Sequence, residues 1–352
     1  MPRDGLCEVP GRYYLSRMPK HHWISDDPLA LEQGGTLEQL EITYHTYGTL
    51  RPGSRVIWVC HALTASSDVA DWWSGLIGEG AYFDPERDFI VCANILGSCY
   101  GSSGPLTLHP HHGRPYYSAF PNITIRDMVA AHDRLRAHLG IEQIDIAMGG
   151  SMGGYQVLEW AIMHPERIGK LILMVTGASE SAWGQAIHAT QRMAIENDPT
   201  WADPTKEAGN LGLMTARALG MLTYRNYETF VATQATPEPQ LTDHRAASYV
   251  QYQGKKLADR FHAYSYWLLS LAMDGHHVGR DRGPIKDVLG ALPHPALVIG
   301  ISSDILCPPP EQRALAFMLP HGQFVRIDSP YGHDGFLLEY EQITKAIDRF
   351  LG

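Results

Sequence analysis

A glycine-rich turn between an apolar run and a helical pattern most constrains how this chain can fold. Residues 144–148 form the apolar run, Gly149-Gly-Ser-Met-Gly153 follows, and the helical pattern then continues to His164. A serine at a sharp strand-to-helix turn needs small neighbours, because the strained backbone and the adjoining helix leave little room for side chains. The pattern predicts Ser151 as a nucleophile, and the alternative interpretation is an ordinary glycine turn.

Short apolar runs alternate with helical patterns along much of the chain, which indicates an α/β fold with a mostly parallel sheet. Nearly every position in these runs is apolar, as in interior strands that are covered on both faces. The predicted strands cover residues 56–60, 89–93, 144–148, 171–175, 296–301 and 324–327. A capping box, Thr124-Ile-Arg-Asp127, begins a predicted crossover helix that ends at Gly140.

Residues 181–282 break this alternation. Strand-type runs disappear there, and Trp, Met, Tyr, Gln and His are scattered through sequence compatible with helices. We therefore predict an inserted helical lid, with one core domain formed by residues 1–180 and 283–352. The composition agrees with a folded chain that buries a substantial core, since 44% of the 352 residues are hydrophobic and 19% are charged.

Charge and composition lower the expectation of several other classes of protein. A net charge of −10 gives no general attraction to phosphate backbones or anionic membranes, so we expect neither nucleic acid nor membrane as a partner. No apolar run approaches the roughly 20 residues of a membrane span, and the N-terminus lacks a secretory pattern. These features predict a cytoplasmic protein.

Cysteine and histidine spacing predicts no metal site. The cysteines are Cys7, Cys60, Cys92, Cys99 and Cys307. They are odd in number, lie mostly in apolar runs and form no Cys-x-x-Cys pair, so buried free thiols are expected. The histidines of residues 109–112 have no second group at metal-ligand spacing and are expected on a surface loop.

A serine hydroxyl becomes a good nucleophile only beside a positioned base that a third group orients. On a fold with this strand-turn-helix element, the partners follow in the order serine, acid, histidine. Asp304 follows a late predicted strand, and His333 lies in the loop after the next strand. Asp328 and Asp334 compete as the acid, but the chain order favours Asp304, and an immediate neighbour of the histidine would point its side chain elsewhere.

Acyl transfer also needs donors for the developing oxyanion. The backbone amide of Met152 is the expected first donor, because it directly follows the nucleophile. The amide of Leu63 is the expected second, since Cys60-His-Ala-Leu-Thr64 follows an earlier strand; His61 itself is interpreted as structural. Residues 94–105 are rich in glycine but match no phosphate-binding pattern, so they are interpreted as a folded loop beside the pocket.

Several segments together are similar to the homoserine O-acetyltransferase family of α/β-hydrolase-fold enzymes. Their order and spacing carry the resemblance over nearly the whole chain, and they are residues 61–64, 92–105, 124–128, 149–154, 216–225, 300–306 and 329–334. The resemblance implies transfer of an acetyl group from acetyl-CoA to the side-chain hydroxyl of L-homoserine, a step toward methionine, through an acyl-serine. It implies no permanently bound cofactor, and it suggests a homodimer formed through the lid.

The resemblance also implies roles for individual residues. The family's triad corresponds to Ser151, Asp304 and His333. Arg217 would hold the substrate carboxylate, Asp334 would hold its ammonium group, and Tyr224 would line the site. From the residues alone, the alternative interpretation of Arg217 is a surface residue of the lid.

Other functions fit the same triad. A carboxylic-ester hydrolase would use it with water as acceptor, and a non-catalytic binding protein could keep the fold without the chemistry. Closer alternatives are a homoserine O-succinyltransferase and a serine O-acyltransferase of the same fold. A succinyl donor would need a further cationic or polar partner, which the sequence does not identify. A transferase must also exclude water and position its acceptor, and a zwitterionic acceptor suits that requirement.

Overall fold

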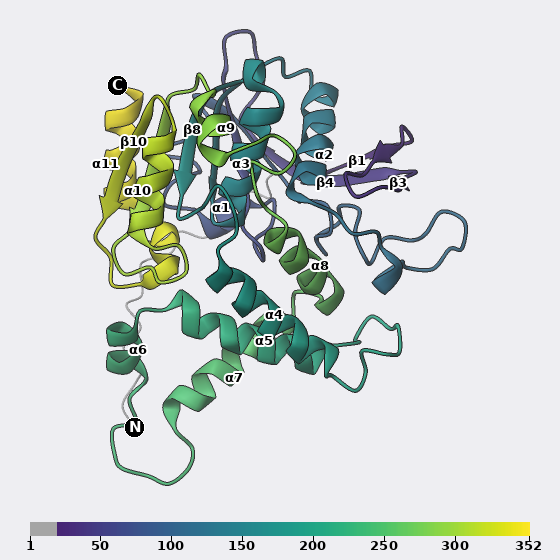
Figure 1. Cartoon of the computed structure of the whole chain (residues 1–352), viewed down its shortest axis with the longest axis vertical. Coiled ribbons are helices and arrows are strands. Elements are labelled where there is room, and N and C mark those ends of the chain that lie inside the picture. The colour runs from purple at the N-terminus through teal and green to yellow at the C-terminus, as the bar shows by residue number, and fades with distance from the viewer. Residues whose placement is uncertain (1–19) are drawn as a thin grey trace.

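A computed structural model describes residues 20–352 and has an eight-stranded sheet at its centre (Figure 1). The strand order is β1-β4-β6-β5-β7-β8-β9-β10. The six strands from β6 to β10 in this order are parallel, whereas β1 and β4 pair antiparallel at one edge. Their bounds are β1 Lys20–Ser25, β4 Leu40–Tyr47, β5 Arg55–Cys60, β6 Asp88–Ala93, β7 Ile144–Gly150, β8 Ile168–Met174, β9 Ala296–Ile301 and β10 Gly322–Ile327.

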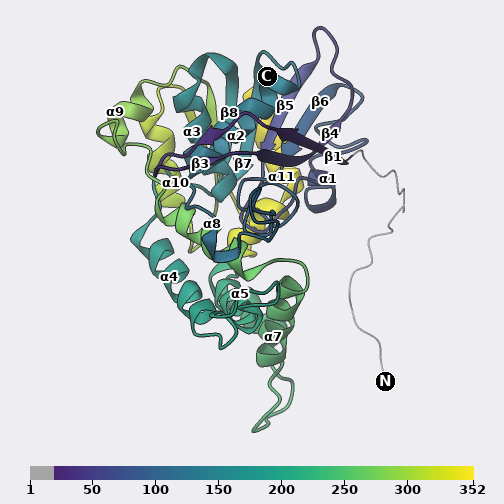
Figure 2. The same cartoon turned by 90° about the vertical axis from the view of Figure 1, so that its right-hand side faces the viewer.

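Helices cover both faces of this sheet (Figures 1 and 2). Trp58 and Cys60 of β5 pack in the cluster that contains α2, α3 and α10, whereas Ile57 and Val59 pack in the cluster that contains α1 and α11. Because both faces are buried, these strands read as continuous apolar runs. The helices are α1 Val69–Trp72, α2 Ile125–His138, α3 Met152–Met163, α10 Pro309–Met318 and α11 Tyr340–Leu351. A short two-stranded sheet joins β2 Leu29–Ala30 and β3 Thr36–Leu37.

The predicted mostly parallel sheet is confirmed, and each of the six predicted strands matches one of β5 to β10 within a few residues. The capping box is confirmed at α2, where Thr124 and Asp127 bond reciprocally. β1 and β4 were not predicted from the sequence. β1 alternates exposed and half-buried positions, and β4 carries the buried polar residues Thr43 and His45, so neither has the apolar run of an interior strand.

Between β8 and β9 the chain forms a group of helices, of which α4 to α7 extend below the sheet in Figure 1. Their bounds are α4 Ala182–Glu196, α5 Asn210–Tyr224, α6 Tyr227–Gln234, α7 Arg245–Ala258, α8 Ala263–Asp274 and α9 Ile285–Gly290. We call residues 181–282 the helical insertion. Its boundaries, and the division of the chain into two domains, stay predictions.

The chain passes from β8 to α4, and returns after α8, through two adjacent segments. The amide of Glu180 donates to the carbonyl of His276 at 3.0 Å, and the amide of Val278 donates to the carbonyl of Ala178 at 2.9 Å. The two segments therefore form a narrow neck, which is residues 178–180 beside 276–278. Beyond this neck, α5 of the insertion packs against the 3-10 helix Gly332–Leu337, which follows β10.

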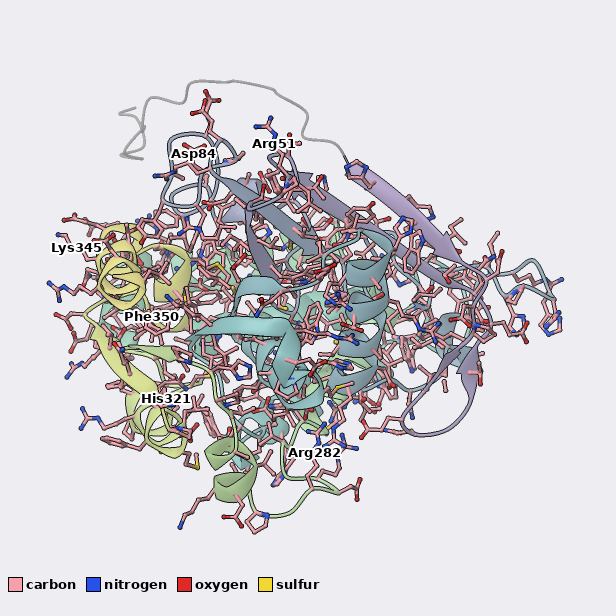
Figure 3. All side chains as sticks on the ribbon, turned by 90° about the horizontal axis from the view of Figure 1, so that it is seen from above. Arg51, Asp84, Arg282, His321, Lys345 and Phe350 are labelled. Carbon is pink, nitrogen blue, oxygen red and sulfur yellow. The ribbon has the colours of Figure 1, made fainter. Side chains whose placement is uncertain are left out.

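The opposite end of the molecule is seen from above in Figure 3, where the side chains of Arg51 and Lys345 lie at the rim. Within residues 20–352, no helix combines the length and the apolar character that a membrane crossing requires.

Cys60 and Cys92 are buried free thiols, as predicted, and Cys99 and Cys307 are free and partly buried. The prediction for Cys7 lies outside the described residues.

Candidate active site

Ser151 lies between β7 and α3 with φ 55° and ψ −128°, a conformation that side-chain-bearing residues rarely adopt. The flanking glycines are required by close packing. A Cβ at Gly149 would lie 2.5 Å from the carbonyl carbon of Gly153, and a Cβ at Gly153 would lie 2.1 Å from the carbonyl oxygen of Cys60. The predicted strand-turn-helix element is confirmed, with Ser151 at its turn.

Two side chains that the sequence analysis missed support the turn from behind. Gln312 of α10 is fully buried; its Oε1 accepts from the amide of Thr176 at 2.9 Å, and its Nε2 donates to the carbonyl of Thr176 at 2.5 Å. The hydroxyl of Thr176 in turn donates to the carbonyl of Ser151 at 2.8 Å. These bonds fix the backbone of the serine without using its hydroxyl. Gln312 shares the buried face of α10 with Leu315 and Ala316, and a polar residue on such an apolar face was the signal that could have identified it.

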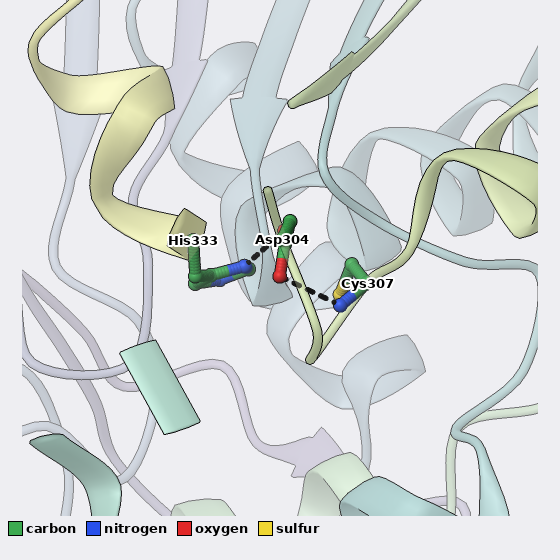
Figure 4. A group of neighbouring side chains, drawn as sticks. All are labelled: Asp304, Cys307 and His333. Atoms are coloured by element: carbon green, nitrogen blue, oxygen red, sulfur yellow. Dashed lines mark hydrogen bonds and ion pairs between the residues drawn. The ribbon is translucent and has the colours of Figure 1, made fainter. Parts of the chain in front are cut away.

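Asp304 and His333 meet beside this turn, although they come from different loops (Figure 4). His333 Nδ1 lies 2.7 Å from Asp304 Oδ2, and both residues are buried. Asp304 Oδ1 accepts from the amides of Leu306 at 2.8 Å and Cys307 at 3.0 Å. The carboxylate is therefore held by the backbone of its own loop while its second oxygen orients the imidazole, leaving His333 Nε2 free to act on another group.

Phe336 connects this pair to the serine. Its ring centroid lies 5.6 Å from that of His333, and a Cβ at Gly150 would lie 2.4 Å from the same ring. Within residues 20–352, no hydrogen bond joins the Ser151 hydroxyl to His333. In enzymes without substrate such contacts are often long and shorten only in the complex. The structure thus brings together Asp304 and His333 directly, and Phe336 links the histidine loop to Gly150, the residue before Ser151.

Two opposing effects set the pKa of His333. Burial is the larger single effect and lowers this pKa, but the charge of Asp304, its hydrogen bond, and the charges of Asp334 and Glu180 together raise it above its ordinary value of 6.5. A raised pKa makes the imidazole a stronger base, and it also means that the neutral, base-competent form predominates only at a pH above this value. Glu180, at the neck of the helical insertion, was another residue that the sequence analysis missed.

Asp304, Cys307 and His333 also place one possible metal-ligand atom each within 4.8 Å of one another (Figure 4). A metal would compete with interactions that already exist, because both oxygens of Asp304 accept hydrogen bonds. Burial raises the pKa of the Cys307 thiol well above its ordinary value, which keeps it protonated and a poor ligand. The chemistry of this cluster therefore suits a proton-transfer pair better than a metal site.

The two competing aspartates have other surroundings. Asp328 is exposed, and its nearest cation is Arg326 at 3.9 Å. Asp334 Oδ2 lies 3.4 Å from Nη2 of Arg225, at the end of α5. Arg225 was not singled out from the sequence, although it directly follows Tyr224. The structure therefore places neither alternative acid on the imidazole of His333.

The expected oxyanion donors lie on adjoining segments. Gly153 packs on the carbonyl of Cys60, which brings the start of α3 against the loop that contains Leu63. In the part of the chain that the structure describes, neither the amide of Leu63 nor that of Met152 donates a hydrogen bond to another protein group. His61 is fully buried, and burial lowers its pKa to about 4. The amide of Ile95 donates to its Nε2, as befits a structural role.

The residues expected to bind substrate come from the helical insertion and from the histidine loop. The guanidinium carbon of Arg217 lies 5.3 Å from the ring centroid of Tyr224. The Tyr224 ring stacks on His333 at 5.8 Å between centroids, and Asp334 follows His333 directly. The structure therefore gathers all three around the histidine, with Arg225 added as a partner of Asp334.

Comparison with known proteins agrees with this geometry. Residues 55–340 match the family described as the alpha/beta hydrolase fold. The chain is 46% identical over 334 residues to a homoserine O-acetyltransferase of Cyclobacterium marinum, covering 95% of each chain, and 44% identical to one of Chlorobaculum parvum, covering 93% of each. The chain belongs to the homoserine O-acetyltransferase family. The resemblance and the fold class predicted from the sequence are both confirmed.

Solved structures extend the comparison beyond this family. A homoserine O-acetyltransferase from Staphylococcus aureus superposes with a TM-score of 0.79 at 29% identity, covering 95% of each chain. Esterase E22 gives a TM-score of 0.87 at 22% identity, covering 95% of this chain and all of the other. At that identity the esterase shows the shared fold alone. The homoserine O-acetyltransferase family thus uses a scaffold on which other proteins carry out ester hydrolysis.

Replacing Asp304 by asparagine should lower the pKa of His333. The neutral amide removes the largest attraction that offsets burial, so the desolvation of the imidazolium should then prevail. Histidine ¹³C NMR during a pH titration measures this, with His333→Gln identifying the signal. Asp328→Asn is the matched control and should leave the titration unchanged. An equal midpoint in the wild type and the Asp304→Asn protein would contradict the assignment of Asp304 as the partner of His333.

Proposed function

We propose that this protein is a homoserine O-acetyltransferase, which transfers acetyl from acetyl-CoA to the side-chain hydroxyl of L-homoserine in a step toward methionine. The observation that carries the proposal is the buried Asp304–His333 pair beside the strained Ser151, in a chain 46% identical to a protein of that name over 95% of both lengths. The two-step route needs no resident cofactor, since acetyl-CoA enters as a co-substrate and leaves as coenzyme A.

In the first step, His333 removes the proton from Ser151, whose oxygen attacks the thioester carbonyl. The amides of Leu63 and Met152 stabilise the oxyanion, and a donor of this kind typically contributes about 10²- to 10³-fold in rate. Met152 is the first residue of α3, so the positive end of the helix dipole also faces the developing charge. The carbon–sulfur bond breaks, and His333 returns the proton to the departing sulfur.

In the second step, His333 removes a proton from the hydroxyl of homoserine, whose oxygen attacks the acyl-serine. The same amides stabilise the second oxyanion, and the ester bond to Ser151 breaks as the histidine returns the proton to the serine. The hydrogen bond from the Thr176 hydroxyl to the Ser151 carbonyl supports this cycle, because it holds the backbone of Ser151 while the serine hydroxyl changes between free and acylated forms.

Recognition of the acceptor uses its two charges. Arg217 binds the carboxylate through its planar guanidinium, Asp334 binds the ammonium group, and Tyr224 lines the site between them. Tyr224 supports this arrangement by contacting both Arg217 and His333. Asp334 Oδ2 lies 3.4 Å from Arg225, and we propose that the carboxylate also accepts from the ammonium group of the ligand. A zwitterion bound in this way fixes the acceptor hydroxyl beside the base, where it competes with water.

We further propose that residues 181–282 act as the lid over this site and that two lids form a homodimer. The lid exposes apolar residues that include Leu222, which is 55% exposed. A groove of about 360 Å³ crosses α5, α6 and α7, lined by Thr215, Ala218, Leu219, Leu222, Phe230, Ala246, Ala247 and Val250. Burial of such a face by a second copy would remove it from water. Because acetyl-CoA supplies the acyl group, we place the enzyme in the cytoplasm.

Incubation with acetyl-CoA and no acceptor should add the mass of one acetyl group to the protein at Ser151. Homoserine should then discharge this adduct much faster than water does. Peptide mass spectrometry locates the adduct, and Ser151→Ala should lose both the adduct and more than about 10⁴-fold in turnover. Transfer retained by Ser151→Ala would exclude the proposal.

Crossing acetyl-CoA and succinyl-CoA with homoserine and serine separates the related transferases, and discharge by water alone would indicate an ester hydrolase.

Arg217→Lys should raise the KM for homoserine by about 10- to 100-fold, because an ammonium cannot reproduce the paired hydrogen bonds of a guanidinium to a carboxylate. Steady-state kinetics with homoserine and with 3-aminopropan-1-ol, which lacks the carboxylate, test this. The wild type should strongly prefer homoserine, and the variant should lose most of that preference. The KM for acetyl-CoA serves as the internal control and should stay constant. A preserved preference for homoserine would assign the carboxylate to another residue.

Leu222→Arg should convert the homodimer into monomers, since a charge placed in an apolar interface is costly to desolvate. Sedimentation velocity measures the change. Phe317→Arg is the matched control, because Phe317 is 81% exposed on α10, away from the lid. A wild-type protein that sediments as a monomer, or a Leu222→Arg protein that remains a dimer, would contradict a dimer formed through this groove.

A further inference from the structure

Arg260 reaches from the helical insertion to the loop that carries Leu63. It lies in the turn between α7 and α8. Its Nη1 donates to the carbonyl of Thr64 at 2.7 Å and to the hydroxyl of Tyr100 at 2.5 Å. Thr64 directly follows Leu63, whose amide is a proposed oxyanion donor. A side chain of the insertion is therefore bonded to the backbone next to a proposed oxyanion donor.

The turn that carries Arg260 is itself anchored. Phe261 is only 4% exposed, and its ring meets that of Tyr100 edge to face at 5.6 Å between centroids. The amide of Arg260 donates to the carbonyl of Leu257 at 2.9 Å, which continues the last turn of α7. The backbone of Arg260 is therefore held in place, and the guanidinium loses less conformational freedom on bonding to the loop than it would from a mobile turn.

The loop on the other side is held at its two ends by the core. At its start, His61 Nε2 accepts from the amide of Ile95, so Nδ1 carries the proton and donates to the carbonyl of Ala62 at 2.8 Å. That carbonyl belongs to the same peptide plane as the amide of Leu63. At the far end, the amide of Ser67 donates to Asn94 Oδ1 at 2.8 Å. Arg260 holds the segment between these two points.

We propose that Arg260 is a positioning residue that keeps the amide of Leu63 aligned with the oxyanion, so that the helical insertion completes the oxyanion hole. The inference rests on the proposed function. His61 fixes the peptide plane that precedes Leu63, and Arg260 fixes the carbonyl that follows it. With both held, the backbone between them has little freedom to rotate the donor away. The insertion then contributes to the chemical step as well as to binding of the acceptor.

Arg260→Ala should lower kcat by about tenfold for acetyl transfer, because small displacements of a reacting or stabilising group have effects of this order or larger. The same loss of kcat should appear in the hydrolysis of p-nitrophenyl acetate. This ester reacts in the same oxyanion hole, but its leaving group is not coenzyme A. The KM for acetyl-CoA should change little. Arg260→Lys should recover part of kcat, and millimolar guanidinium chloride should partly restore kcat of Arg260→Ala, since the site is exposed to solvent.

Arg245→Ala is the matched control, because Arg245 is an exposed arginine of the same helical insertion and should leave kcat unchanged. A raised KM for acetyl-CoA with an unchanged kcat for the small ester would overturn the inference and make Arg260 a contact for the phosphates of coenzyme A. A loss of kcat that tracks a lower melting temperature, without rescue by guanidinium, would also overturn it. The proposed function fails separately, when Ser151→Ala still forms the acetyl adduct.

Discussion

The packing of Gly153 on the carbonyl of Cys60 is the contact on which the rest of the site depends. It joins the start of α3 to the end of β5 with no room for a single methyl group. This contact brings the start of α3 against the loop that contains Leu63, so the proposed nucleophile and the proposed oxyanion donor are placed by backbone against backbone. Protein interiors resist such small changes in volume, and the geometry is therefore rigid before any substrate arrives.

Charge is concentrated around a single imidazole. Asp304 holds His333 directly, while Asp334 and Glu180 act on it from two other segments. Three carboxylates offset the cost of charging a buried base, and only one of them is bonded to it. Of the other two, Asp334 belongs to the proposed ammonium site, and Glu180 lies at the neck of the helical insertion. The pKa of His333 therefore depends on charges from three separate segments of the chain.

Much of this arrangement could be predicted from the sequence, for physical reasons. Strands covered on both faces must be apolar throughout, so β5 to β10 could be predicted from their apolar runs. The strained turn admits only small residues beside Ser151, so its glycines could be recognised. The edge strand β1 and its neighbour β4 carry mixed polarity and gave no such signal. Asp304 and His333 were found through chain order, whereas the contacts of Gln312, Arg225 and Arg260 depend on how distant segments pack, which no local pattern records.

The neck of the helical insertion has a consequence for how proteins of this fold diverge. Residues 178–180 and 276–278 lie side by side, bonded through their own backbones. A polypeptide excursion whose two ends are already joined can be replaced by another of different length without moving the sheet. On the roles proposed for Arg217 and Arg260, such a replacement would exchange the acceptor site as a module while Asp304 and His333 stay in place, provided that the new module supplies its own cation to the loop after β5.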